Sequence, residues 1–390
     1  MDCITIEANP EKGQVIHIGE LYEALKQVQD KRQEKGKRYT IEILLIVVIL
    51  AKLCGENTPY GMADWAKRRA EELQSLFGYH RRVSPSNKTL QRLADTSVVD
   101  ENVQAVTRTY LHQTYGGQQS ILITIDGKTL RGTIPKGETR GVHLLAAYLP
   151  EEGVVLLQVE VGDKENEIVV APKLLRQLDL KGRVVSGDAM FTQRAISVEV
   201  LAGGGDYLWF VKDNQPTLHE DVQCFFQEME HASGWHVPPL PKIVAEDTTK
   251  QSGRIETRRL TAMPDEENYL QWPGVRTVFK LERHVLQPRK EQEWTQVVYG
   301  ITSLAFTPQL ASQLLTWTRQ HWGIENKLHY RRDVTLREDA TRMKHKHQAQ
   351  VVATLNNFAI ALATYLGFSN LAGARRFFQA KFDALLFSAT

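Results

Sequence analysis

The chain has 390 residues, of which 42% are hydrophobic and 24% charged, and this composition is typical of a folded globular protein rather than a disordered or fibrous one. Its length suffices for two domains. The formal net charge of +2 is too small to indicate a nucleic-acid partner by itself, and three scattered cysteines without a CxxC pair argue against a disulfide framework or a zinc site.

Residues 1–115 have the periodicity of helices. Helical segments are expected at 21–34, 41–54, 60–78 (ended by Gly78), 84–95 (with a capped start) and 98–114. The apolar run at 41–54 contains Glu42 and Lys52 and is shorter than the roughly 20 residues of a membrane span, so we expect a buried helix. Several short helices with basic turns are typical of a helix-turn-helix-like DNA reader, and equally of a helical scaffold or dimerisation domain.

Basic residues gather in a few short segments. These are 31–38, 67–69, 80–82 and 342–347. Such clusters suit phosphate contacts, and they suit a plain solvated surface equally well.

The pattern after residue 116 alternates between strands and helices. Strands are expected at 120–127, 142–150, 153–163, 182–190 and 206–215, and helices at 166–180 and 192–205. Three strands, a helix, a strand, a helix and a strand is the order of an RNase H-like α/β core. Residues 216–304 predict a β-rich insertion with strands at 253–263, 276–286 and 293–304, and helical periodicity returns after Thr307-Pro308.

Two aspartates end predicted central strands. Asp126 closes "SILITID" and Asp188 closes "GRVVSGD". A carboxylate in so apolar a setting is costly unless it is paired or bound to a metal, although each alone is also explained as a cap of the following turn. Together, on strands expected to be neighbours, they favour a shared divalent cation such as Mg²⁺, which prefers a few carboxylates plus water and phosphate.

A third acid is expected on the helix that follows the insertion. At about 100° per residue, His321, His329 and Arg332 fall within roughly 40° of Glu325 on one face. Asp333 lies about 80° away, and Glu338 lies on the far side if the helix continues. Glu325 is thus the acid flanked by groups suited to phosphate, and the alternative is a surface glutamate with ordinary helical partners.

Four sequence blocks resemble the DDE transposases of bacterial insertion sequences, in the group that includes the H-repeat-associated proteins. The blocks are "ITIDGKTLRGT", "DKENEIVVAPKLLRQLDLKGRVVSGDAMFTQ", "GGDYLWFVKDNQPTL" and "RQHWGIENKLHYRRDVTLREDATR". The segment from "RYTIEILLIVVIL" to "SPSNKTLQRL" is similar to that family's N-terminal associated domain. The resemblance implies a helical, DNA-binding transposase-associated domain at 1–115. It also implies an RNase H-like DDE catalytic domain at 116–390, with the β-rich insertion at about 216–304.

The resemblance also implies the chemistry. Asp126, Asp188 and Glu325 would bind two Mg²⁺ or Mn²⁺ ions, one activating water or a 3′-hydroxyl and the other stabilising the leaving oxygen. Residues expected to contact DNA, with solvent-facing salt bridges as the alternative for the first four, are Lys128, Arg131, Lys212, Asn214, Arg319, His321, His329 and Arg332. The implied partners are transposon-end DNA, target DNA and a second copy of the chain in a synaptic complex.

The segment around Glu325 departs from the family pattern. Many relatives carry Tyr, Arg, Glu and Lys at fixed spacing, and the three places around Glu325 hold Thr318, His321 and Arg332 here. The departure concerns which residue handles the DNA strand and not the acids.

Three rival functions remain open. They are a metal-dependent nuclease without strand transfer, a domesticated non-catalytic DNA-binding protein, and a helical scaffold with an inert α/β domain. With no signal-peptide pattern at the start of the sequence and no membrane partner expected, the predicted location is the bacterial cytoplasm, in association with the nucleoid.

Overall fold

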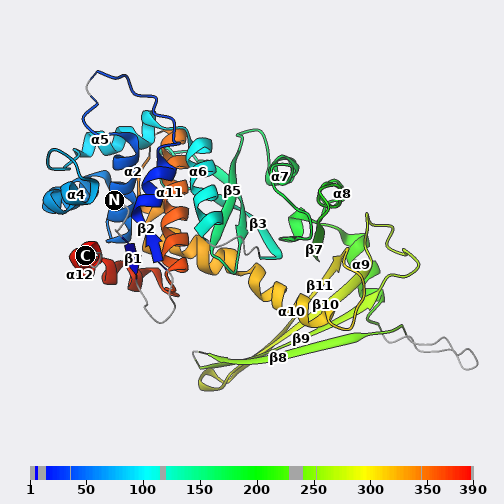
Figure 1. Ribbon diagram of the computed structural model, residues 1–390. Helices are drawn as coiled ribbons and strands as arrows, with labels where there is room; N and C mark the ends of the chain where they lie inside the picture. Colours follow the sequence, from blue (N-terminus) through cyan, green and yellow to red (C-terminus); the bar gives the residue numbers. More distant parts are fainter. Residues whose placement is uncertain are drawn as a thin grey trace, which may run out of the picture. The chain divides into compact units, whose positions relative to one another are not determined.

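The computed structural model describes residues 5–7, 15–35, 37–114, 120–227, 240–251, 253–343 and 345–387. The chain forms two compact units (Figure 1). Unit 1 comprises Met1–Gln119, Gly127–Glu160 and Glu325–Thr390, and unit 2 comprises Ser120–Asp126 and Val161–Ile324. The predicted domain boundary at residues 115 and 116 falls outside the described residues and stays a prediction.

Unit 1 is mainly helical. Its elements are β1 (Thr5–Glu7), β2 (Val15–His17), α1 (Ile18–Leu25), α2 (Ile41–Leu53), α3 (Pro59–Arg68), α4 (Ala70–Phe77), α5 (Asn87–Arg92), the π-helix η2 (Leu93–Ser97), α6 (Asp100–Thr114), η3 (Arg131–Thr133), β4 (His143–Leu149), β5 (Val154–Val161), η8 (Glu338–Ala340), α11 (Lys346–Tyr365) and α12 (Leu371–Phe387). The C-terminal helices α11 and α12 both pack against α2. The strands of this unit are ordered β5-β4-β3, and of β3 (Leu122–Thr129) only residues 127–129 belong to it.

Helix α2 is the centre of unit 1. Every one of its residues is buried, including Glu42 and Lys52, because apolar side chains occupy all sides of the helix. The predicted buried helix is therefore confirmed. Among the described residues, the structure contains no helix with the length and apolar character needed to cross a membrane.

The predicted helix at 60–78 is two helices. The chain breaks at Arg69, whose φ of −114° and ψ of 26° are not helical, so α3 and α4 run separately. The predicted stop at Gly78 is confirmed, since its φ of +56° is a left-handed conformation that glycine adopts at little cost. The capped start of α5 is also confirmed, because the Ser86 side chain accepts a hydrogen bond from the Thr89 backbone N–H.

Unit 2 is built on one mixed sheet. Besides the first part of β3 it contains α7 (Glu167–Leu175), β6 (Val184–Gly187), η4 (Ala189–Phe191), α8 (Arg194–Ala202), β7 (Asp206–Val211), α9 (Pro216–Cys224), β8 (Ile243–Gln251), β9 (Arg254–Pro264), β10 (Thr277–Gln287), η5 (Pro288–Lys290), β11 (Gln292–Thr302) and α10 (Leu310–His321). The strand order is β3-β6-β7-β11-β10-β9-β8. Strands β3, β6 and β7 are parallel, and the remaining pairs are antiparallel.

The insertion continues the central sheet. Strand β11 pairs with β7 from Tyr299 opposite Val211 to Thr302 opposite Leu208. The three predicted strands are present, and a fourth, β8, was missed because its sequence IVAEDTTKQ is largely polar and lies at an edge. Helix α9, which precedes these strands, was missed as well.

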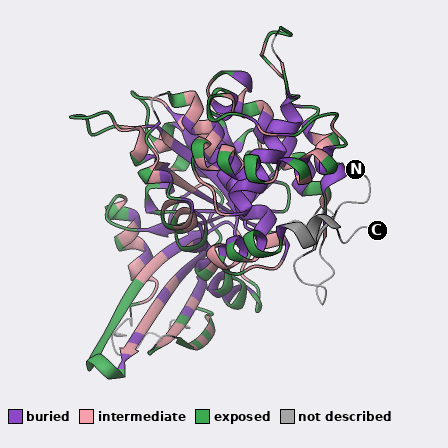
Figure 2. Cartoon of the chain, turned by 90° about the vertical axis from the view of Figure 1, so that its left-hand side faces the viewer, coloured by how far each residue is buried: buried purple, intermediate pink, exposed green. Residues whose placement is uncertain are grey.

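Helix α10 packs on the sheet of unit 2 through one face. Leu310, Leu314 and Trp317 recur at helical spacing and share a core with residues of β3, β6, β7, β9 and β10. His321 continues the same spacing and is 2% exposed. Figure 2 colours the residues by burial, with the buried ones in purple. This packing carries His321 to the end of β6.

Candidate active site

Asp126 and Asp188 follow the last paired residues of two neighbouring strands. Ile125 is opposite Gly187 in the parallel β3–β6 pair, and each aspartate is the next residue in the chain. Because neighbouring strands lie about 4.8 Å apart, the two aspartates are adjacent along this edge. The prediction of neighbouring strands is confirmed. The prediction that Asp126 ends its strand is wrong, since β3 runs on to Thr129 and only the pairing with β6 ends before Asp126.

The turn after β6 is fixed by a glycine. A Cβ on Gly187 would lie 2.8 Å from Cδ2 of Phe191, closer than real side chains come, and 3.0 Å from Cγ1 of Ile125, which is a tight contact. Phe191 folds back here because its backbone N–H donates to the Asp188 carbonyl at 2.8 Å. The side chain of Asp188 is left about half exposed, at 52%.

His321 holds the Asp188 carboxylate. Its Nε2 lies 3.1 Å from Oδ1 of Asp188, and its Nδ1 lies 2.9 Å from Oγ of Ser186, two residues earlier on β6. Phe210 flanks the ring, with the centroids 5.0 Å apart. The hydrogen bond and charge of His321, with a smaller effect of Lys212, lower the pKa of Asp188 against the opposing effect of burial. Asp188 is therefore kept as a carboxylate, which is the form that binds metal.

Two predicted DNA-contact residues follow β7. Lys212 and Asn214 are exposed, and the Asn214 amide Nδ2 donates to the Ala189 carbonyl at 2.7 Å. Asn214 thereby ties the end of β7 to the turn that carries Asp188. Arg319 is exposed on α10 and forms an ion pair with Asp247 of β8.

The segment after α10 is not the regular helix that the sequence predicted. It forms the π-helices η6 (Ile324–His329) and η7 (Arg331–Thr335). The Leu336 N–H donates to the carbonyl five residues earlier, that of Arg331, at 2.9 Å, which is the spacing of a π-helix. Each residue of a π-helix turns the chain by less than 100°, so the calculated helix face is wrong. Glu325 is exposed, and π-helical turns are frequent at functional sites.

Arg332 and Glu338 form a buried pair in unit 1. Their side chains are 1% and 0% exposed, and Nε of Arg332 donates to Oε2 of Glu338 at 2.8 Å. Asn356 donates to Oε1 of Glu338 at 2.8 Å and accepts from Nζ of the buried Lys52 at 2.6 Å. Glu338 is thus a structural acid, and the guanidinium of Arg332 is committed to it.

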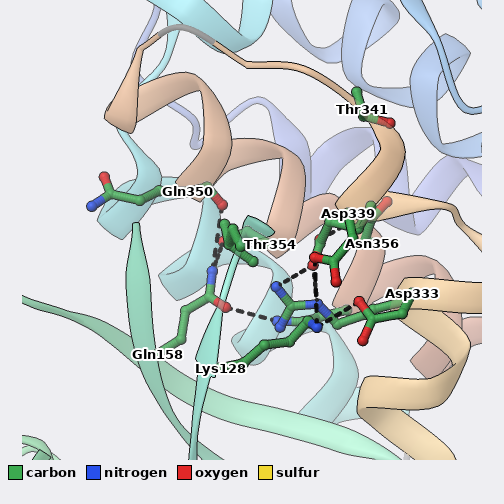
Figure 3. Close-up of polar contacts among 12 residues, drawn as sticks. Lys128, Gln158, Asp333, Asp339, Thr341, Gln350, Thr354 and Asn356 are labelled. Atoms are coloured by element: carbon green, nitrogen blue, oxygen red, sulfur yellow. Dashed lines mark hydrogen bonds and ion pairs between the residues drawn. The ribbon is translucent and has the colours of Figure 1, made fainter. Parts of the chain in front are cut away.

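Lys128 is enclosed by two carboxylates (Figure 3). Its Nζ lies 2.5 Å from Oδ1 of Asp333 and 4.0 Å from Oδ1 of Asp339, and the side chain is 8% exposed. Asp339 also accepts from the backbone N–H of Arg131 at 3.1 Å, while the Arg131 side chain remains exposed. Burial and the positive charges of Arg332 and Lys128 lower the pKa of His329 to about 3, so its ring is neutral at physiological pH.

The predicted DNA contacts divide by burial. Three are buried and bonded to acids of their own unit, which supports a role in positioning those acids: Lys128, His321 and Arg332. Four are exposed: Arg131, Lys212, Asn214 and Arg319. DNA contact stays a prediction for all eight residues.

Glu325 belongs to unit 1 and the two aspartates to unit 2, and their convergence likewise stays a prediction. Within the described part of the chain, no group of three or more His, Cys, Asp or Glu side chains is arranged to hold a metal ion.

Comparison with known proteins identifies the chain's family. Residues 117–362 match the family described as "Transposase DDE domain". The chain belongs to this family. Residues 22–109 of this DDE-family chain match the "DDE_Tnp_1-associated" family as well, so the predicted resemblance is confirmed.

The chain is similar to curated proteins of Escherichia coli over most of its length. It is 26% identical to "Putative protein YbfL" and 26% identical to "H repeat-associated putative transposase YhhI" of strain K12, each over 90% of this chain and 91% of the relative. It is 28% identical to "Putative transposase YncI" of O157:H7, over 88% of this chain and 87% of the relative. The solved piggyBac transposase synaptic complex with hairpin DNA aligns at a TM-score of 0.39 and 12% identity, covering 95% of this chain and 77% of that one, too distant to support any argument.

Sequence reasoning missed two features of the candidate site. Ser186 precedes Asp188 by two residues, so the period of a strand places both on one face, and that signal was present. The π-helical geometry after His321 left no sequence signal.

Proposed function

We propose that this DDE-family protein is a DNA transposase that cleaves the ends of its insertion sequence and joins them to target DNA by two-metal-ion phosphoryl transfer. The observation that carries the proposal is the adjacency of Asp126 and Asp188 after the last β3–β6 pair, with Asp188 kept ionised by His321. The family motif adds Glu325 as the third acid.

The donor set suits Mg²⁺ or Mn²⁺. These ions take one or two carboxylates and complete their shell with water and substrate phosphate, and two adjacent aspartates at a strand edge offer that arrangement. When bound, two such ions activate a water or 3′-hydroxyl and stabilise the leaving oxygen of an in-line displacement at phosphorus. His321 and Ser186 orient Asp188, and Asn214 fixes the turn beside it.

We propose that the catalytic domain is RNase H-like. The strand order supports this assignment: β5-β4-β3 in unit 1 and β3-β6-β7 in unit 2. In the sequence, α7 lies between β5 and β6, and α8 lies between β6 and β7. The predicted domains at 1–115 and 116–390 are retained in this proposal.

The proposed partners are element-end DNA, target DNA and a second copy of the chain. Arg131, Lys212 and Arg319 are exposed cations suited to phosphate, and Arg319 also pairs with Asp247. Asn214 is exposed two residues after Lys212, and its amide binds the Ala189 carbonyl. The proposed site of action is the nucleoid in the cytoplasm.

The proposal is tested by Mg²⁺-dependent cleavage of duplex DNA taken from the flanks of the protein's own gene. Asp188→Asn and Asp126→Asn should abolish cleavage and joining. Asp179→Asn, which changes an exposed acid of the same unit, should leave both intact. Activity that survives Asp188→Asn would overturn the mechanism, and cleavage without any joined product would identify a nuclease.

A further inference from the structure

A long β-arm projects from unit 2 at the edge that carries Asp188. Strand β6 is parallel to β7, with Gly187 opposite Trp209, so Asp188 lies at the edge where β7 ends. Strand β11 is antiparallel to β7, and its residues before Tyr299 run beyond Val211, the last residue of β7. The seven residues 292–298 therefore extend past that edge, by roughly 23 Å at 3.3 Å per residue.

Two hairpin turns lie side by side at the far end of the arm (Figures 1 and 2). One turn joins β8 to β9 after Gln251, and the other joins β10 to β11 through η5. Their neighbourhood follows from the pairing of Leu286 on β10 with Ile255 on β9.

A hollow of about 340 Å³ lies at these turns. Three exposed cations line it, Lys250 and Arg254 from the first hairpin and Arg289 from the second. Ile255 and Pro288 give it an apolar part, and the described residues that line it include no Asp or Glu.

Glu291 of the second turn and Glu293 of β11 do not line the hollow, and Glu256 of β9 is already neutralised. Glu256, next to Ile255, pairs with both Arg258 at 2.5 Å and Arg283. The charge of the three lining cations is thus available to an external anion.

We propose that this hollow binds the phosphate backbone of duplex DNA whose scissile phosphate lies at Asp188. The cations suit backbone phosphates, and the apolar part suits the deoxyribose between them. An arm of roughly 23 Å corresponds to about seven base pairs, and the hollow also lies several strands across the sheet from β6, so it would contact the duplex at least about seven base pairs from the cleaved bond. This inference rests on the proposed function, which supplies DNA as the partner.

The test is the salt dependence of binding to a fluorescent duplex, measured by anisotropy with the full chain. Removing two phosphate contacts with Lys250→Ala/Arg289→Ala should lower the slope of log affinity against log salt by about 1.8, and Arg289→Ala alone by about 0.9. Lys290→Ala removes the same charge from the same turn, but Lys290 does not line the hollow. This matched control should leave the slope unchanged.

A second comparison uses DNA length. On a duplex truncated to about four base pairs on the side covered by the arm, the double variant and the wild type should have equal slopes. A Lys250→Gln/Arg289→Gln variant, which keeps longer side chains, covers any loss of folding in the alanine variant.

The outcomes separate the two proposals. If the wild type cleaves DNA but Lys250→Ala/Arg289→Ala keeps its slope, or if Lys290→Ala matches Arg289→Ala, the hollow is not the contact and the transposase proposal stands. If the wild type binds no DNA at low salt, both proposals are overturned.

Discussion

Nε2 of His321 lies 3.1 Å from Oδ1 of Asp188, and the other ring nitrogen lies 2.9 Å from Oγ of Ser186. One imidazole thus spans two residues of a single strand from a helix that packs on the sheet. The ring is buried and directed at a carboxylate of its own unit. The consequence is that helix α10 determines where Asp188 points.

Replacing His321 should weaken metal binding without unfolding the protein. We expect His321→Leu to lower Mn²⁺ affinity by about 10- to 100-fold, as for other residues that orient a metal ligand. His321→Gln, which retains a hydrogen-bond donor, should have a Mn²⁺ affinity between those of His321→Leu and the wild type. Calorimetric Mn²⁺ titration measures this, with Arg319→Gln on the exposed side of the same helix as the control. Equal Mn²⁺ affinity in His321→Leu and the wild type would show that the ring does not position Asp188.

Glu325 and Glu338 should respond oppositely to the same substitution. Glu338→Gln leaves the buried Arg332 and Lys52 without a counter-charge and should cost about 3–5 kcal/mol of unfolding free energy. Glu325→Gln changes an exposed side chain and should alter stability by less than about 0.5 kcal/mol while abolishing DNA cleavage. Urea unfolding and cleavage assays on both variants decide this. A Glu325→Gln protein that still cuts DNA would remove Glu325 from the mechanism.

His329 should make stability depend on pH. Its folded pKa is about 3 and its ordinary pKa 6.5, so between these values the unfolded chain binds more protons. The stabilisation is complete above pH 6.5 and is lost, as pH falls towards 3, at about 1.4 kcal/mol per pH unit. Unfolding free energies of the wild type and His329→Gln should therefore diverge over this window, and parallel curves would contradict the neutral, buried ring.

Gly187 should be intolerant of a side chain. Gly187→Ala places a Cβ against Phe191 and Ile125 and should destabilise the protein by about 1–3 kcal/mol. The matched control is Gly373→Ala in α12, where the nearest atoms are 3.9 Å away and a gain of about 0.4–1 kcal/mol is expected. Thermal unfolding measures both. An unchanged melting temperature for Gly187→Ala would show that the turn before Asp188 yields easily.

The sequence predicted those features that depend on local pattern. The apolar run of α2, the caps at Ser86 and Gly78, and the strands that carry Asp126 and Asp188 all follow from periodicity and turn chemistry. The family resemblance could also be seen in the sequence, because its motifs are local sequence patterns.

The sequence did not predict features that depend on tertiary packing. Glu338 is buried with Arg332 and Asn356, and Asn356 in turn binds Lys52, which lies 304 residues away in the sequence. The π-helices change the direction of the side chains at 324–329 and 331–335. Edge strand β8 is defined by its pairing with β9 and not by its largely polar sequence.

The central claim is that Asp126, Asp188 and Glu325 hold the catalytic ions. Its most direct test is a crystal structure of the chain with its element-end DNA and Mn²⁺, in which anomalous scattering locates the ions. We predict two peaks about 3.5–4 Å apart, contacted by all three carboxylates and by the scissile phosphate. Mn²⁺ bound away from the two aspartates, or DNA seated in the complex with Glu325 facing solvent, would contradict the account.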